Sequence, residues 1–98
     1  MRVSLCIIAR DEAEELGPCI ESARSVVDEI VVVDTGSSDE TIAVARAHGA
    51  NVIQALWTDD FAAVRNIGLA QASGAWVLAL DADERLSSEA ADSLVGIE

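Results

Sequence analysis

The sequence predicts an α/β fold, a Rossmann-like parallel sheet with helices on both faces. Four short apolar runs alternate with stretches of helical character, an order typical of parallel strands joined by right-handed crossovers. Three of the runs are almost continuously apolar, as expected for strands that are covered on both faces. A chain of 98 residues suits one domain, so we assign residues 1–98 to a single domain without an internal boundary.

The predicted strands are built from Val, Ile, Leu and Ala, because aromatic residues are scarce. The first, second and fourth runs are nearly free of polar residues, whereas Asn51 and Gln54 interrupt the third. We therefore expect the first, second and fourth strands to lie in the interior of the sheet. The expected strands are Val3–Ala9, Ile30–Val33, Ala50–Ala55 and Trp76–Leu80.

The predicted helices follow the strands. In Glu14–Ser25, apolar residues recur at near-helical spacing, and Pro18 is expected close to the helix start because proline is tolerated only in the first turn. Ser37 and Glu40 match a capping box, which predicts a helix up to His48. The remaining signals are Gly49 as the stop of that helix, Asp59 or Asp60 as the cap of Phe61–Gln71, and a last helix from Ser87 to near Gly96.

Composition narrows the possible functions. A net charge of −12 argues against a nucleic acid partner and against anionic lipid, and it is compatible with a cation that bridges an anionic ligand to carboxylates. A solvated acidic surface is the simpler explanation of the charge alone. Cys6 and Cys19 match no zinc or disulfide pattern, so we expect two buried thiols in a reducing compartment. Without a signal peptide or a long apolar run, we expect a cytoplasmic chain with no integral membrane segment.

Acidic residues follow all four predicted strands. Because ligands of open parallel sheets bind at the carboxyl ends of the strands, we expect these side chains to surround a ligand site. Carboxylates converging there would repel one another unless a cation or hydrogen-bond donors relieve them. The segments are Arg10-Asp11-Glu12, Asp34-Thr35-Gly36-Ser37-Ser38-Asp39, Asp59-Asp60 and Asp81-Ala82-Asp83-Glu84.

Asp81 and Asp83 have the chemistry of a site for Mg²⁺ or Mn²⁺. Two carboxylates at the end of a strand can both turn toward a hard cation that keeps waters and bridges to phosphates. An Asp-rich turn is the structural alternative, because Asp is a common turn former. The position after an apolar strand, at an edge with other acids, favours the metal.

Other residues allow two interpretations. Gly36 permits a sharp turn or the close approach of a ligand, and Ser37 suits a helix cap. Arg65 is either a surface arginine or a partner of a diphosphate. His48 suits a structural role at a helix end, and we expect both tryptophans to pack, with Trp57 the less certain of the two. No Gly-rich pyrophosphate loop or Gly-Lys-Ser/Thr is present, which excludes dinucleotide and P-loop sites.

The sequence resembles the inverting family 2 glycosyltransferases of the GT-A fold. The matching segments are SLCIIARDEAEEL, DEIVVVDTGSSDETIAVARAHGA and WTDDFAAVRNIGLAQASGAWVLALDADERL, in order over nearly the whole chain. The last segment is similar to lipopolysaccharide or lipooligosaccharide core β-1,4-glucosyltransferases. The resemblance implies the N-terminal, nucleotide-binding part of a GT-A fold.

The resemblance also implies roles for individual residues. Asp11 departs from the Asn that is usual in the family, and Thr35 departs from a second Asp. Asp83 matches the direct metal ligand, and Asp81 lies nearer the ribose. The implied nucleotide-sugar-binding residues are Ile8, Ala9 and Arg10 in the base pocket, Glu12, Asp34, Thr35 and Gly36, Arg65 near the diphosphate, and Asp81 with Ala82.

The implied reaction is transfer of a sugar from a nucleotide-diphosphate sugar, with a UDP-sugar favoured, to a saccharide or lipid-linked acceptor in cell-surface glycan synthesis. The metal neutralises the leaving diphosphate. The carboxylate base that an inverting enzyme needs is expected beyond Glu98, so we expect an inactive part of a longer protein, peripheral to the inner membrane when complete. An exposed sheet edge in such a part favours a homo-oligomer.

Two other functions remain as alternatives. One is a non-catalytic nucleotide-binding or interaction module, which the departures at Asp11 and Thr35 and the expected lack of a base favour. The other is a phosphotransfer domain with Asp81 as nucleophile. The second is disfavoured because the D-x-D motif of such phosphatases follows the first strand, and here it follows the fourth.

Overall fold

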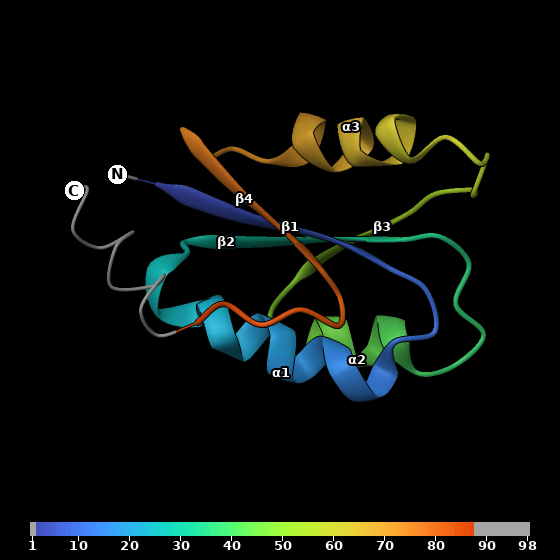
Figure 1. Cartoon of the computed structure of the whole chain (residues 1–98), viewed down its shortest axis with the longest axis horizontal. Coiled ribbons are helices and arrows are strands. Elements are labelled where there is room, and N and C mark those ends of the chain that lie inside the picture. Colours follow the sequence, from blue (N-terminus) through green and yellow to red (C-terminus); the bar gives the residue numbers. More distant parts are fainter. Residues whose placement is uncertain (1, 88–98) are drawn as a thin grey trace.

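Four parallel strands form one sheet in the computed structural model, which describes residues 2–87 (Figure 1). The strand order is β3-β2-β1-β4, and all three neighbouring pairs are parallel. The expected last helix after Ser87 lies outside the described residues. The strands match the predicted runs to within one residue at each end; they are β1 (Val3–Ala9), β2 (Glu29–Asp34), β3 (Asn51–Gln54) and β4 (Trp76–Asp81).

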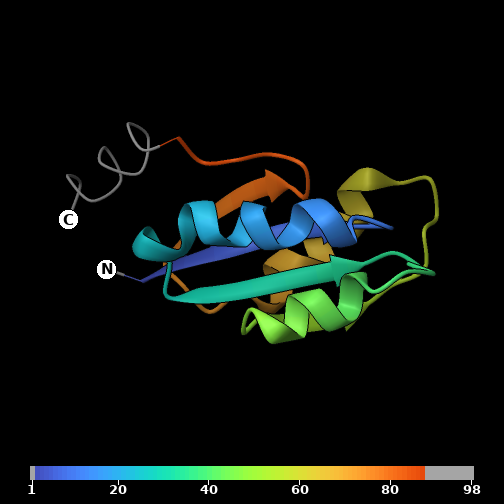
Figure 2. The ribbon, with the colours of Figure 1, turned by 90° about the horizontal axis from the view of Figure 1, so that it is seen from below.

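Helices cover both faces of the sheet, as the sequence predicts (Figures 1 and 2). One face carries α1 (Ala13–Ala23), the short 3-10 helix η1 (Arg24–Val26) and α2 (Thr41–Ala47), and the other carries α3 (Phe61–Gln71). The main core lies under α1 and α2. Its largest side chains, from β1, β2 and α1, are fully buried: Leu5, Ile7, Leu16, Ile20 and Val32.

The expectation that β4 is an interior strand is wrong. In the described part of the chain β4 pairs only with β1 and forms one edge of the sheet. Trp76, which we expected to pack, is 56% exposed, and Val77 is 41% exposed. A continuous apolar run reflects the character of a segment and cannot specify how many neighbours that segment has.

The position of Pro18 also differs from the prediction. Helix α1 begins at Ala13, and the N–H groups of Glu15 and Leu16 both donate to the carbonyl of Glu12. Pro18 therefore lies inside the helix, where its missing N–H removes one intrahelical hydrogen bond at a cost of about 3 kcal/mol. Burial of the α1 face that carries Leu16, Cys19 and Ile20 offsets this cost.

The predicted capping box does not form. Helix α2 begins at Thr41, and Ser37 lies outside it, where its hydroxyl accepts from the N–H of Asp11 and donates to Asp34. The N–H of Thr41 instead donates to Oδ1 of Asp39 at 2.9 Å. Two other helix signals are confirmed: Gly49 follows the last turn with a φ of 84°, and the Asp60 carboxylate accepts from the N–H of Ala63 at 3.1 Å.

Candidate functional site at the carboxyl ends of the strands

A cavity of about 380 Å³ lies at the carboxyl ends of β1, β2 and β4. The strand order reverses between β1 and β4, so this is the edge at which open α/β sheets bind ligands. Most of the residues that the sequence indicated meet here. The cavity is lined by Ile8, Ala9, Arg10, Glu12, Thr35, Asp81, Ala82 and Asp83, together with Trp57 and Phe61.

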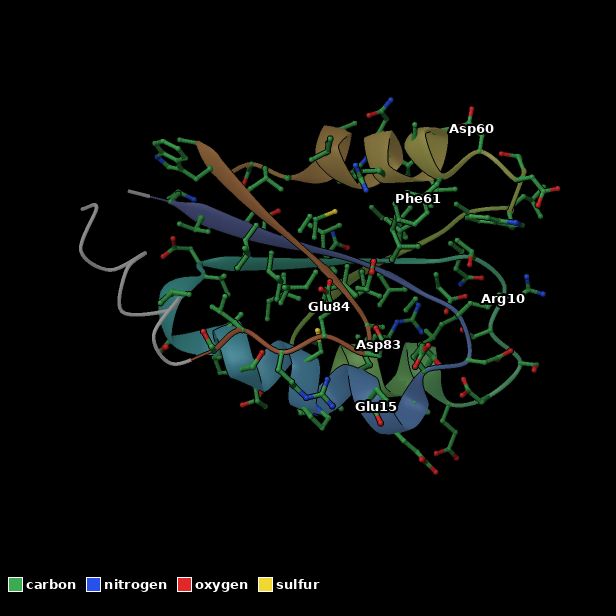
Figure 3. All side chains as sticks on the ribbon, in the orientation of Figure 1. Arg10, Glu15, Asp60, Phe61, Asp83 and Glu84 are labelled. Carbon is green, nitrogen blue, oxygen red and sulfur yellow. The ribbon has the colours of Figure 1, made fainter. Side chains whose placement is uncertain are left out.

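The register of the sheet explains why these residues meet. Ala9 pairs with Asp34 across β1 and β2, and Ile8 pairs with Asp81 across β1 and β4. The three strands therefore end side by side, and the segments that follow them surround one space. Figure 3 shows Arg10 beyond the end of β1, Phe61 at the start of α3, and Asp83 in the turn after β4.

Asp34 and Gly36 lie beside this cavity and do not line it. The Asp34 side chain is buried, and its Oδ1 accepts from the N–H groups of Gly36 at 3.0 Å and Ser37 at 2.9 Å. Gly36 has a φ of 110°, which favours glycine, so the loop is a tight turn built around Asp34. Both residues line a neighbouring cavity of about 220 Å³ beside the end of β3.

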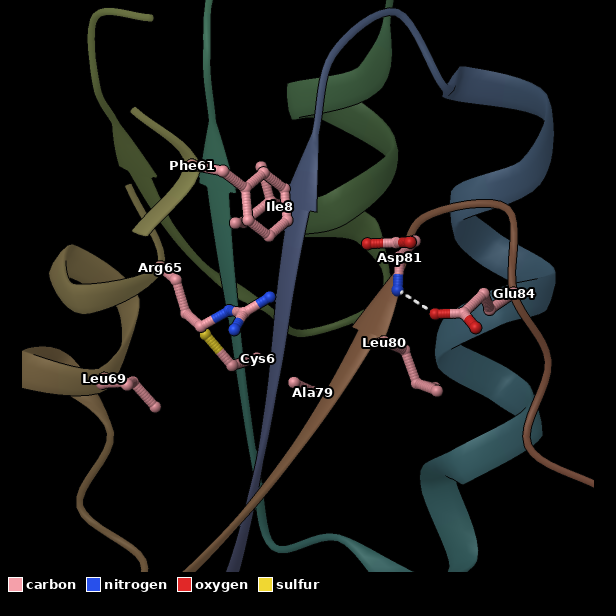
Figure 4. A pocket seen from close by; sticks show the side chains of 9 residues that line it. All are labelled: Cys6, Ile8, Phe61, Arg65, Leu69, Ala79, Leu80, Asp81 and Glu84. Atoms are coloured by element: carbon pink, nitrogen blue, oxygen red, sulfur yellow. Dashed lines mark hydrogen bonds between the residues drawn. The ribbon is translucent and has the colours of Figure 1, made fainter. Parts of the chain in front are cut away.

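Arg65 lines a third cavity of about 170 Å³ between α3, β1 and β4 (Figure 4). Its guanidinium carbon lies 4.8 Å from the centroid of the Phe61 ring, within the range of a cation–π contact. Ile8, Phe61 and Asp81 line both this cavity and the large one, so the two are neighbours.

Both thiols are buried, as the sequence predicts. Burial raises the pKa of the Cys6 thiol, and the positive charge of Arg65 opposes part of that rise. Burial also raises the pKa of Cys19 to about 11, against the opposing charge of Arg85. Neutral thiols are poor nucleophiles and poor metal ligands, so neither cysteine adds chemistry to the site.

The turn after β4 presents two carboxylates to the large cavity. Oε1 of Glu84 accepts from the Asp81 N–H at 2.6 Å, and the Glu84 N–H donates to the Asp81 carbonyl at 2.9 Å (Figure 4). These bonds close the turn, and the side chains of Asp81 and Asp83 line the cavity. Within residues 2–87, no group of three or more His, Cys, Asp or Glu side chains could hold a metal ion. Two carboxylates nevertheless suit Mg²⁺ or Mn²⁺ when phosphate and water complete the coordination.

Apart from Glu12, which lines the large cavity, the acids at the other strand ends do not converge there, contrary to our expectation. The carboxylate of Asp11 bonds to the N–H of Ser38, and that of Asp39 bonds to Thr41. Asp59 accepts from the indole of Trp57, and Asp60 caps α3. Nearby donors thus satisfy these carboxylates individually, which removes the repulsion that the sequence suggested.

Trp57 and Phe61 are site residues that the sequence analysis missed. Trp57 was expected to pack, but it is 40% exposed and lines the large cavity with Phe61. The only sequence signal for Trp57 is its place in a loop beside acidic residues. Glu84 was among the acids expected near the ligand site, but its hydrogen bond with the backbone of Asp81 depends on the shape of the turn and was not predicted.

Comparison with known proteins identifies relatives of the whole chain. The sequence model described as "Glycosyl transferase family 2" matches residues 4–96. A TPR repeat-containing protein of Synechococcus elongatus is 53% identical, with 91% of this chain and 22% of that protein covered. A lipopolysaccharide core biosynthesis glycosyltransferase of Rhizobium meliloti is 38% identical, with 86% of this chain and 32% of that protein covered.

A solved structure with the same architecture is glucosyl-3-phosphoglycerate synthase from Mycobacterium tuberculosis in complex with UDP. It is 28% identical, has a TM-score of 0.74, and covers 85% of this chain and 34% of its own. Another structure of that enzyme holds Mn²⁺, UDP and glucosyl-3-phosphoglycerate. The chain thus spans about a fifth to a third of the relatives that it matches. No helix among its described residues is long and apolar enough to cross a membrane.

Proposed function

The chain belongs to glycosyl transferase family 2, and on this premise we propose that it is the donor-binding part of an inverting glycosyltransferase. The reaction is transfer of a hexose from a nucleotide-diphosphate sugar to an acceptor hydroxyl. One observation carries the proposal: the two acids after β4 line the same cavity as the residues after β1 and β2. The nucleoside of a donor and the charged diphosphate that links it to the sugar differ in chemistry, and the cavity offers a different surface to each.

The nucleoside lies against the ends of β1 and β2 in this proposal. Ile8 and Ala9 supply an apolar floor, and Arg10, Glu12 and Thr35 supply polar groups at the rim. Asp34 mainly stabilises the turn that follows it, because its carboxylate already accepts hydrogen bonds from the N–H groups of Gly36 and Ser37. UDP is the favoured nucleotide, since the solved relative from M. tuberculosis is described in complex with it.

The diphosphate lies toward the turn after β4. Asp83 would be the direct ligand of Mg²⁺ or Mn²⁺, and Asp81 would lie nearer the ribose. When bound, the metal neutralises charge on the departing diphosphate. Arg65 is the nearby cation for the same phosphates, and it would act from the adjoining cavity that shares Asp81 and Phe61 with the large one.

The acceptor and its activation are assigned to the longer protein. We infer that the base lies beyond Glu98 and that these 98 residues bind donor without transferring sugar. The name of the Rhizobium relative, a lipopolysaccharide core biosynthesis glycosyltransferase, supports a saccharide or lipid-linked acceptor in cell-surface glycan synthesis. The second candidate, a non-catalytic binding module, is favoured by Asp11 and Thr35, the two positions at which the chain departs from the pattern that the resemblance implies.

Calorimetry with UDP tests the proposal. UDP should bind the chain in the presence of Mn²⁺ and at least tenfold more weakly in EDTA, and Asp83→Asn should remove this metal dependence. Glu14→Gln is the matched control, because it removes one charge from an exposed acid on α1 outside the cavity. Equal UDP binding with and without metal would contradict the donor site. Sugar transfer by the longer native protein would exclude the non-catalytic module.

A further inference from the structure

Two of the three aromatic residues of the chain lie on one wall of the large cavity. Trp57 is in the loop between β3 and α3, and Phe61 is the first residue of α3. Both are about two-fifths exposed, so neither ring is buried in the apolar core. An exposed indole beside a ligand cavity needs a reason other than core packing.

The loop holds the indole in one orientation. Its Nε1–H donates to Oδ1 of Asp59 at 2.8 Å. Asp59 has a φ of 59°, a left-handed conformation that Asp adopts more readily than most residues and that fixes the course of the loop. The Phe61 ring meets the indole edge-on, with centroids 6.4 Å apart and planes at 70°. The aromatic surface is thus fixed from two sides before any ligand binds.

Of the two rings, Trp57 lies farther from the diphosphate end: it lines the large cavity but not the adjoining one, which Phe61 lines together with Asp81 and Arg65. The order β3-β2-β1-β4 places the loop after β3 on the β2 side, whereas Asp81 and Asp83 follow the edge strand β4. A ligand whose phosphates lie at the acids therefore directs its other end toward Trp57. An aromatic ring stacks well on any planar ring and carries no charge, so it suits a base and does not suit a phosphate.

We propose that Trp57, oriented by Asp59 and Phe61, is the stacking surface for the base of the nucleotide donor. The inference rests on the proposed function, since it takes the acids after β4 as the diphosphate end. It adds a residue for which neither the motifs nor the register of the sheet gave a role. Thr35 and the strand ends remain the groups that distinguish one base from another, because stacking by itself tolerates every base.

The test compares a ligand that has a base with one that lacks it. UDP and inorganic pyrophosphate are titrated with Mn²⁺ into the chain and into Trp57→Ala. We expect the UDP dissociation constant to rise about tenfold, as for loss of one stacked base, and pyrophosphate affinity to stay unchanged. Trp57→Phe should keep most of the UDP affinity, because it keeps a ring. Trp76→Ala is the matched control, since Trp76 is exposed on β4 and lines none of the three cavities described above.

Fluorescence gives an independent reading. In Trp76→Phe the indole of Trp57 is the single tryptophan, so UDP with Mn²⁺ should change its emission and pyrophosphate should not. Unchanged UDP affinity in Trp57→Ala would overturn the stacking role and leave the donor site intact. Failure of the unmodified chain to bind UDP would overturn both. If Trp57→Ala lost affinity for UDP and for pyrophosphate equally, with an unchanged circular dichroism spectrum, Trp57 would act on the whole site. That result would also overturn the proposal.

Discussion

The carboxylate of Asp11 accepts a hydrogen bond from the backbone N–H of Ser38 at 2.7 Å and so joins the loops that follow β1 and β2. The contact is reciprocal, because the N–H of Asp11 donates to the hydroxyl of Ser37 at 2.9 Å. Asp11 has a φ of 52°, a conformation that Asp and Asn tolerate better than most residues. This explains why Asp can stand where the family usually has Asn, since either side chain supplies the Oδ1 acceptor.

Asp11 is therefore expected to hold the loop that carries Arg10 and Glu12 to the cavity. Asp11→Ala should lower the free energy of unfolding by about 1–2 kcal/mol, because it removes the acceptor and leaves a strained backbone. Asp11→Asn should be nearly neutral. Asp11→Gly separates the two causes, because it relieves the strain and still lacks the acceptor. Urea unfolding of the three variants checks this, and an Asp11→Ala variant as stable as the unmodified chain would contradict the role.

The close approach of α3 to the sheet depends on Gly68. A Cβ at this position would collide with Sγ of Cys6 and come within 3.1 Å of Cγ2 of Val33. Gly68→Ala should therefore destabilise the chain by about 1–3 kcal/mol, despite the better helix propensity of Ala. The control is the double variant with Cys6→Ala, which should recover part of the loss. Thermal unfolding of the two single variants and the double variant gives the coupling energy between the two positions. If the losses of stability were purely additive, the collision would be excluded.

The strands were predictable because buried strands have an apolar composition. The edge of the sheet that carries the candidate site was predictable because the carboxyl ends of parallel strands lie together. The run at residues 30–33 became β2, and the residues after β1 and β4 meet in one cavity. The turn around Asp34, the edge position of β4 and the place of Pro18 inside α1 were not predictable. Each depends on which donors, neighbours or packing surfaces lie nearby in space, and a linear pattern does not contain that information.

Stability should fall in acid in part through Glu29, at the start of β2. Hydrogen bonds from the hydroxyl and then the N–H of Ser73, with a further one from Ser4, lower the pKa of this carboxyl below its ordinary value. A depressed folded-state pKa stabilises the chain above the unfolded-state pKa of about 4.3. That contribution is lost as the pH falls through the folded-state pKa.

Glu29→Gln should accordingly lower the melting temperature at pH 7 and flatten its decline between pH 5 and pH 3. Glu14→Gln is the matched control, because Glu14 is exposed and has no hydrogen bond comparable to those of Glu29. Differential scanning calorimetry across this range measures both variants. A decline as steep in Glu29→Gln as in the unmodified chain would assign the acid sensitivity to other carboxylates.

Glu84 is expected to determine how well Asp81 and Asp83 are presented to a metal. Its Oε1 accepts from the Asp81 N–H at 2.6 Å and thereby closes the turn after β4, while the next residue, Arg85, pairs with Glu15 of α1 at 2.5 Å. Glu84→Ala should weaken Mn²⁺-dependent UDP binding several-fold, because the turn then samples other shapes. Glu84→Gln keeps an oxygen acceptor at the same place and should retain most of the affinity, although it removes a negative charge. Calorimetry with UDP and Mn²⁺ distinguishes the two causes, because a loss that is equal in both variants would mean that the charge of Glu84 matters and the hydrogen bond does not.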